Sequence, residues 1–367
     1  MESIRNFLAL GTAKVLFAFA WAITGNASNY VELWSNSGKY AEATSVKNMD
    51  HAECDFPVCS FSGHFDLQEI FTEMTEAGTQ VAICNATEEK LLELISCSKT
   101  MAIFSACREG LLTTYMPILE KINRKIDVFV LDNDNTIVDR AKALCKNGLV
   151  SFHQAVIHAV CSNVEFDKKH GTITLTADNS VDVVFPPEAL WLKDHIIDTS
   201  QSLFSSRARF KFCESPTEFE YFCKSKIIDV NGIHTLISLA VYHKGLKEGD
   251  NLKKIADSTF ADYISLDELL KIASTGHSKM YKSLITNTER MKEYEGEEGV
   301  HQEIMKCFVR RTYDSRDKIK RGVDFEDAES VKKMHRHLEY LKWIIDPEVQ
   351  NILYEVLTYL KDTGVLT

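Results

Sequence analysis

Short apolar runs alternate with helical patterns between Arg5 and about Pro187. The runs have the length and apolar character of buried strands, and they read NFLAL, YVELW, QVAIC, TMAIF and IDVFVLD. Two segments, TEEKLLELISC and NTIVDRAKALC, place apolar residues at helical spacing behind a Thr or Asn that can cap a helix. Alternating strands and helices predict a parallel sheet covered by helices. We therefore predict an α/β, Rossmann-like N-terminal domain over residues 1–190.

The strand pattern ends at a pair of prolines. The segment HGTITLTADNSVDVVF, residues 170–185, alternates apolar and polar residues on both sides of a DN turn and stops before Pro186 and Pro187. Consecutive prolines interrupt regular structure and here give the strongest boundary signal in the chain. Beyond them the apolar spacing becomes helical, in segments such as HRHLEYLKWII and EVQNILYEVLTYLK. We predict an all-α C-terminal domain over residues 191–367.

The segment KVLFAFAWAIT, residues 14–24, is almost wholly apolar and allows two interpretations. It is similar to the apolar core of a signal peptide, although it is too short to span a bilayer. Alternatively, it is a buried helix that follows a first strand and a turn at Gly11. Ten cysteines without any CxxC pair indicate buried thiols in a reducing compartment. We favour the buried helix and a cytoplasmic location.

Charge and spacing exclude several kinds of partner. The 367 residues carry 42 Lys and Arg against 53 Asp and Glu, and the formal net charge of −11 repels polyanions. We therefore expect neither a nucleic-acid nor a membrane partner. We also predict no metal site, because the possible zinc ligands lack the spacing of a finger or ribbon; these ligands are His51, Cys54, Cys59 and His64.

The first strand and its turn read LALGTAKVLFAF, which is a weak form of a dinucleotide-binding turn. Such a turn uses glycines so that the backbone can approach a pyrophosphate at the start of a helix. Gly11 is present, whereas Ala13 and Leu16 occupy the places expected for further glycines. The end of the second strand carries Ser35 and Asn36 instead of an acidic residue. A strand-to-helix turn that binds no ligand remains an equal alternative.

A more informative group lies in KIIDVNGIH, where Lys226, Asn231 and His234 are spaced i, i+5 and i+8. On a helix these positions fall at about 0°, 140° and 80°, so they share one arc of about 140°. A desolvated lysine can take a proton from an alcohol, and an amide and an imidazole can stabilise the resulting oxyanion. The alternative is a solvated lysine beside a buried Asn and His whose hydrogen bonds are satisfied.

This Lys, Asn and His spacing resembles the signature of the polyol-specific long-chain dehydrogenase/reductase family. The likeness extends weakly over most of the chain. LGTAKVLFAF corresponds to the family's Gly-rich turn, and SNS (residues 35–37) to the end of its second strand. IFSA (residues 103–106) corresponds to its fourth strand, and VLDNDNT (residues 130–136) to its active-site Asn segment. The resemblance implies a bound NAD or NADP, a helical substrate domain, and hydride transfer between a polyol phosphate and a keto sugar phosphate in a monomer or homodimer.

The resemblance also implies roles for individual residues. Lys226 would be the general acid/base, Asn231 and His234 would hold the reacting oxygen, and Asn135 would orient the site. The implied cofactor-binding residues are Gly11, Thr12, Ala13, Ser35, Asn36 and Ser105.

The departures from the family pattern leave three functions open. The first turn has Ala13, Leu16 and Phe17 where the family usually has further glycines and an Arg, and Ser35 replaces the acidic residue that binds the ribose. Without that acidic residue NADP is permitted, although Lys39 is the only cation nearby in the sequence. The chain is therefore a polyol dehydrogenase, or a catalytically degenerate member that acts as a ligand-binding or protein-interaction module. A third alternative is an active enzyme of the same fold with a different substrate.

Overall fold

The computed structural model describes ten stretches of the chain. They are residues 5–26, 28–35, 37–49, 52–63, 65–85, 87–132, 136–158, 161–177, 181–196 and 208–226. The chain forms two compact units, Met1–Phe219 and Glu220–Thr367, so residues 220–226 are the described part of the second.

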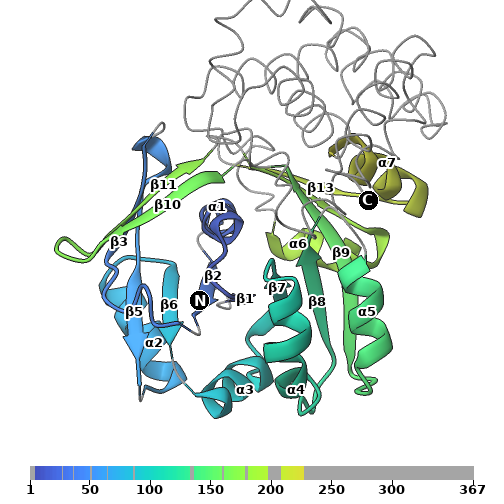
Figure 1. The fold of residues 1–367 in the computed structure, drawn as a ribbon, viewed down its shortest axis with the longest axis horizontal. Coiled ribbons are helices and arrows are strands. Elements are labelled where there is room, and N and C mark those ends of the chain that lie inside the picture. The colour runs from blue at the N-terminus through green and yellow to red at the C-terminus, as the bar shows by residue number, and fades with distance from the viewer. Residues whose placement is uncertain are drawn as a thin grey trace, which may run out of the picture. The chain divides into compact units, whose positions relative to one another are not determined.

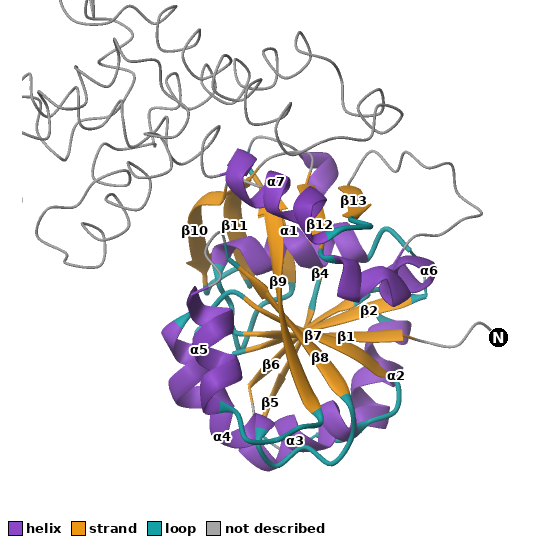
Figure 2. Ribbon diagram, turned by 90° about the vertical axis from the view of Figure 1, so that its right-hand side faces the viewer, coloured by secondary structure: helices purple, strands orange, loops and turns teal. Residues whose placement is uncertain are grey.

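Nine strands within the described residues form one twisted sheet (Figures 1 and 2). In spatial order they are β13 (Ala208–Phe212), β12 (Val181–Phe185), β9 (Val150–His158), β8 (Ile126–Leu131), β7 (Thr100–Ser105), β1 (Arg5–Leu10), β2 (Asn29–Trp34), β6 (Val81–Asn85) and β5 (Cys59–Ser62). All neighbours pair in parallel except β9 and β12. The predicted parallel sheet is confirmed, and each of the five apolar runs quoted above forms one of its strands.

The order of the strands reverses beside β1. From β1 the chain proceeds through β2 to β6 on one side, then returns to the other side of β1 as β7 and continues to β8 and β9. This arrangement is the doubly wound topology, and the reversal lies between β1 and β7.

Helix α1 (Lys14–Ile23) lies between the nine-stranded sheet and a smaller second sheet (Figure 1). The second sheet has the order β10 (Cys161–Asp167), β11 (Thr172–Ala177), β3 (Ser45–Asn48) and β4 (Phe56–Pro57). The ring of Phe19 lies 4.3 Å from that of Phe104, and Phe17 packs edge-on against Tyr40 at 5.6 Å. Sheets on two sides bury this helix, and this burial explains the apolar run at residues 14–24.

The opposite face of the large sheet is covered by amphipathic helices. These are α2 (Leu67–Glu76), α3 (Glu88–Ser96), α4 (Met116–Leu119) and α5 (Thr136–Leu144), with a π-helical turn at Leu111–Tyr115 before α4. A capping box starts α2, in which Asp66 accepts from the Glu69 N–H and the Glu69 carboxylate accepts from the Asp66 N–H. The helices predicted from TEEKLLELISC and NTIVDRAKALC are confirmed as α3 and α5.

The all-α interpretation of residues 191–367 is wrong at β13. After β12, Pro187 opens a 3₁₀ helix at Pro187–Leu192, α6 (Lys193–Ile196) follows, and the chain then adds β13 to the large sheet. The alternating sequence ARFKF places Phe212 in a stacked contact with Phe185, with ring centroids 4.8 Å apart. The two strands around the DN turn, β11 and β12, also belong to different sheets. Helix α7 (Pro216–Lys226) follows β13.

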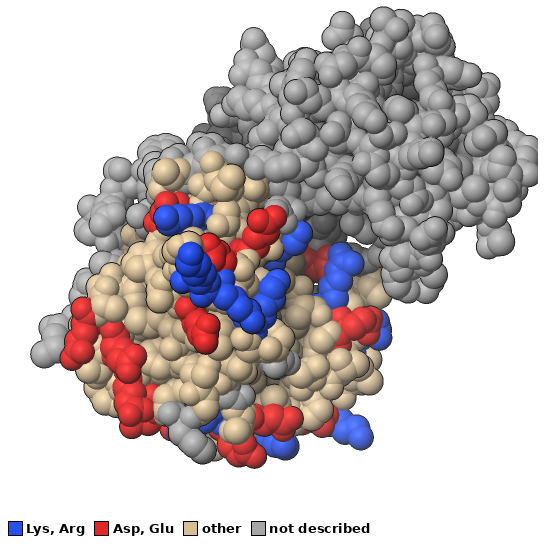
Figure 3. Space-filling model, turned by 60° about the vertical axis from the view of Figure 1, so that its left-hand side comes forward, with Lys and Arg blue, Asp and Glu red and all other residues tan. Residues whose placement is uncertain are grey.

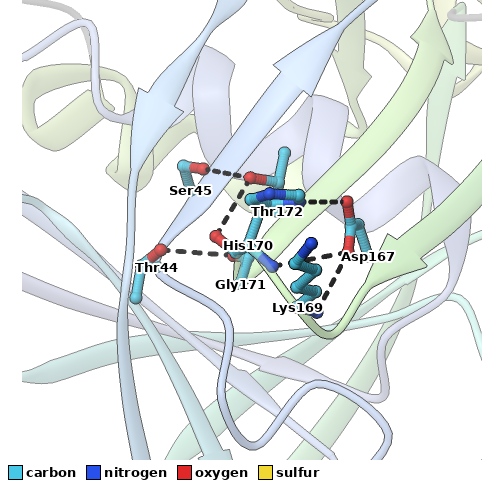
Figure 4. A network of polar contacts seen from close by, with 7 residues as sticks. All are labelled: Thr44, Ser45, Asp167, Lys169, His170, Gly171 and Thr172. Carbon is cyan, nitrogen blue, oxygen red and sulfur yellow. Dashed lines mark hydrogen bonds and ion pairs between the residues drawn. The ribbon is translucent and has the colours of Figure 1, made fainter.

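The hairpin between β10 and β11 is held by a local polar network (Figure 4). The Asp167 carboxylate accepts hydrogen bonds from the Lys169 and His170 N–H groups and lies 2.6 Å from His170 Nδ1. Gly171 follows with φ +62°, and a Cβ there would lie 2.9 Å from the Glu42 carbonyl oxygen. Glycine is therefore required at this turn.

On the face drawn in Figure 3, basic side chains form a short band that acidic side chains flank. None of the helices within the described stretches is long and apolar enough to cross a membrane.

Candidate functional site

The candidate site lies where the strand order reverses, at the carboxyl ends of β1 and β7. Ligands of open parallel sheets bind in the crevice outside this point, because the loops from the two strands diverge to opposite faces. Gly11 follows β1, and Ser105 ends β7. A Cβ on Gly11 would lie 3.5 Å from the Cβ of Cys107, so the two loops are close together.

The turn after β1 presents a helix N-terminus at this edge. Gly11 has φ +93°, a conformation that residues with a side chain rarely adopt, and its N–H donates to the Trp34 carbonyl oxygen at 2.9 Å. Ala13 is the N-cap of α1 and provides no side-chain cap, and no acidic residue occupies the first turn. The N–H groups and dipole at this end of α1 suit an anionic group such as a phosphate.

The bulky residues after the turn belong to the core. Leu16, Phe17 and Phe19 are fully buried among the side chains that separate α1 from the two sheets. The ring contacts of Phe17 and Phe19 are with Tyr40 and Phe104. Both rings therefore contribute to the packing of α1.

Ser35 follows β2 at the same edge, and its hydroxyl is buried. Its backbone N–H donates to the Cys84 carbonyl oxygen at 2.8 Å, and the side chain is only 1% exposed. The hydroxyl oxygen has no hydrogen-bond partner among the residues that the structure describes. Because an unsatisfied buried hydroxyl costs free energy, a ligand hydroxyl at this position would be favourable. Asn36, the next predicted contact, lies outside the described residues.

The loop after β7 contains a thiol beside the turn. Cys107 Sγ lies 3.0 Å from the Ser105 hydroxyl oxygen. Burial raises the pKa of the Cys107 thiol, and the contact with Ser105 opposes part of that rise. The thiol is therefore protonated at neutral pH and is not an activated nucleophile.

Arg108 and Asp132 form an ion pair that the sequence analysis did not identify. Arg108 follows Cys107, and its Nε and Nη2 lie 2.7 and 3.1 Å from the two carboxylate oxygens of Asp132. Asp132 directly follows β8 and is 7% exposed, and its carbonyl oxygen accepts from Gln154 Nε2 at 3.0 Å. The acidic residue at the end of the strand IDVFVLD is the sequence signal that could have identified this position.

The predicted catalytic residues lie mainly outside the described part of the chain. Lys226 is the last residue of α7 and is 9% exposed, so it is not a solvated surface lysine. Burial raises the pKa of the neighbouring Cys223 thiol to about 12, and the charge of Lys226 opposes part of this rise. Asn135, Asn231 and His234 lie outside the described residues, and their convergence with Lys226 stays a prediction. Thr12 lies half-buried in the turn.

Within the described stretches, no group of three or more His, Cys, Asp and Glu side chains is placed to hold a metal ion. Of the possible zinc ligands in the sequence, Cys54 is buried, and His51 and His64 lie outside those stretches.

Comparison with known proteins returned similarities to solved structures only. No protein-family model and no curated protein matches the chain. The chain is similar to yersinopine dehydrogenase with NADP+ bound, at 11% identity and a TM-score of 0.46, over 99% of this chain and 92% of that one. It is similar to D-mandelate dehydrogenase with NADH and anilino(oxo)acetate, at 11% identity and a TM-score of 0.45, over 98% of this chain and 100% of that one. It is also similar to glycerol-3-phosphate dehydrogenase from Coxiella burnetii, at 11% identity and a TM-score of 0.41, over 98% of both chains.

Proposed function

We propose that this chain is an NAD(P)-dependent oxidoreductase that binds the dinucleotide at the carboxyl edge of the nine-stranded sheet. The observation that carries the proposal is the turn at the switch point. There Gly11, with φ +93°, leads into α1, whose first turn has no side-chain cap. The proposal rests on these residues of the chain itself, because the similar structures are only 10–11% identical to it and have TM-scores below 0.5.

The residues present fit such a cofactor. The pyrophosphate would bind the backbone N–H groups of Thr12 and Ala13 at the N-terminus of α1, and Gly11 would let the turn approach it. Ser35, whose buried hydroxyl has no partner among the described residues, would contact the adenosine ribose together with Asn36. Ser105 would line the site from β7. When bound, the nicotinamide would accept or return a hydride.

The residues at the ribose position allow either NAD or NADP. An acidic residue there would repel a 2′-phosphate, and Ser35 carries no charge. Lys39 is close in sequence, but its ammonium group lies 5.0 Å from the centre of the Tyr40 ring in a cation–π contact. We therefore propose no preference between the two cofactors.

For the substrate, we propose a polyol or sugar phosphate, as in the interconversion of mannitol 1-phosphate and fructose 6-phosphate. This finer proposal is supported by the spacing of Lys226, Asn231 and His234 and by the burial of Lys226. Lys226 would take the proton from the reacting hydroxyl, and Asn231 and His234 would hold the oxygen. Asn135 would orient the site. The unit Met1–Phe219, which contains β13, would provide the nucleotide domain, and the unit Glu220–Thr367 the substrate domain.

The first test is binding of the cofactor. NADH and NADPH are titrated separately into the full chain, and nicotinamide fluorescence is followed. We expect one or both to bind, and Gly11→Ala to weaken binding about tenfold or more, because a Cβ at φ +93° displaces the backbone N–H groups of the turn. Gly78→Ala is the matched control, since Gly78 also has a positive φ (+64°) but lies after α2 with open space around it.

No fluorescence response to either nucleotide at millimolar concentration would overturn the proposal and favour the binding-module alternative, in which Ala13 and Leu16 reflect a lost cofactor site.

For the lysine, we expect Lys226→Ala to abolish reduction of fructose 6-phosphate by NADH while leaving NADH binding intact. An unchanged rate would refute its assignment as the acid/base.

A further inference from the structure

Arg108 has a strained backbone at the switch point. Among the described residues it is the one residue other than glycine with a positive φ, at 39°. This conformation is energetically unfavourable for a residue with a side chain. Strain of this kind persists where the surroundings hold the residue in place, and it is concentrated at ligand sites. Arg108 lies in the loop that comes close to the Gly11 turn at Cys107, where a Cβ on Gly11 would lie 3.5 Å from the Cys107 Cβ.

The carboxylate of Asp132 holds the Arg108 side chain in place. The two N–O distances of 2.7 and 3.1 Å form a two-point contact between planar groups. Asp132 is 7% exposed and is anchored through Gln154 to β9. The guanidinium is therefore fixed in position and orientation relative to the carboxyl edge of the sheet.

The ion pair occupies only one edge of the guanidinium. Nε and Nη2 face Asp132, and Nη1 with the second Nη2 proton forms the other edge, which is a fork that matches two oxygens of a phosphate or carboxylate. The Arg108 side chain is 52% exposed, so ligands can reach it. The next carboxylate along the chain, Glu109, is paired with Arg140 in a two-point contact. Glu109 therefore has its own cation.

We propose that Arg108, positioned by Asp132, binds an oxyanion at the carboxyl edge of the sheet, beside the ends of β7 and β8. The oxyanion is the phosphate or carboxylate of the substrate, or the pyrophosphate of the dinucleotide. The identity of this ligand rests on the proposed function, whereas the presence of the site does not. Because Asp132 already immobilises the side chain, little further side-chain entropy is lost when the oxyanion binds.

The test uses inorganic phosphate and NADH as separate probes of the full chain. Phosphate binding is followed by line broadening in ³¹P NMR, and NADH binding by fluorescence. The variants are Arg108→Gln, which removes the fork and the charge, and Asp132→Asn, which keeps the arginine and loosens its support. Arg140→Gln is the matched control, since Arg140 is also half-exposed and pairs with the adjacent Glu109. Circular dichroism checks that each variant is folded.

We expect Arg108→Gln to weaken phosphate binding about tenfold or more, Asp132→Asn to weaken it several-fold, and Arg140→Gln to leave it unchanged. If NADH affinity is kept, the oxyanion belongs to the substrate; if NADH weakens in parallel, it belongs to the cofactor. If wild-type protein binds phosphate through Arg108 but binds neither nucleotide, this site stands and the proposed function fails. The proposal is overturned if folded Arg108→Gln binds both phosphate and NADH as the wild type does. It is also overturned if the wild type binds neither phosphate nor NADH.

Discussion

Glu32 is a buried carboxyl group whose replacement should stabilise the protein in a pH-dependent manner. It lies in the middle of β2, between Leu8 of β1 and Ala82 of β6, and is fully buried. Neither carboxylate oxygen has a hydrogen-bond partner within the described residues. Burial raises the pKa of Glu32 from 4.5 to about 7, and the nearby Asn6 side chain opposes part of this rise.

The direction of the effect follows from the raised pKa. The unfolded chain releases the Glu32 proton above about pH 4.5, whereas the folded protein keeps it until about pH 7. Folding is therefore penalised increasingly between these two values, and the penalty is constant above the second. A shift from 4.5 to about 7 corresponds to a penalty of about 3 kcal/mol at pH 8, and to less than about 1 kcal/mol at pH 5.

Glu32→Gln removes the ionisation and keeps the size of the side chain. We expect the variant to exceed the wild type in free energy of unfolding by about 3 kcal/mol at pH 8 and by less than about 1 kcal/mol at pH 5. Urea unfolding at both pH values, followed by tryptophan fluorescence, measures the difference. Glu76→Gln, at an exposed position in the last turn of α2, is the control and should change stability by no more than about 0.5 kcal/mol. An equal effect of Glu32→Gln at pH 5 and pH 8 would refute the reasoning.

Two further predictions concern local structure. Gly171→Ala should lower the free energy of unfolding by about 2 kcal/mol, which is clearly more than for Gly78→Ala. The two positions have similar φ, but only at Gly171 would a Cβ lie 2.9 Å from a backbone atom. Equal losses of stability in urea unfolding would contradict this explanation. Asp66→Ala should lower the free energy of unfolding by about 1 kcal/mol, because it removes the capping box with Glu69. Asp66→Asn keeps an acceptor for the Glu69 N–H and should retain most of the wild-type stability. If Asp66→Asn is as unstable as Asp66→Ala, the cap is not the cause.

Much of the large sheet was determined by the sequence alone. The strands β1, β2, β6, β7 and β8 are compact apolar runs bounded by turn or cap residues, and their burial on both faces is visible in composition. The turn at Gly11 was likewise a local signal. These features depend on neighbouring residues in the chain, so a single sequence contains them.

Tertiary structure alone decided which distant segments meet. Helix α1 is apolar all round because a second sheet, formed by β3, β4, β10 and β11, covers the side that the first sheet leaves open. β13 became a strand rather than part of a helical region because Phe212 stacks on Phe185. Arg108 meets Asp132 across 24 residues, since β7 and β8 end side by side. Pairing of this kind depends on which strand ends become neighbours, and local propensity does not encode that choice.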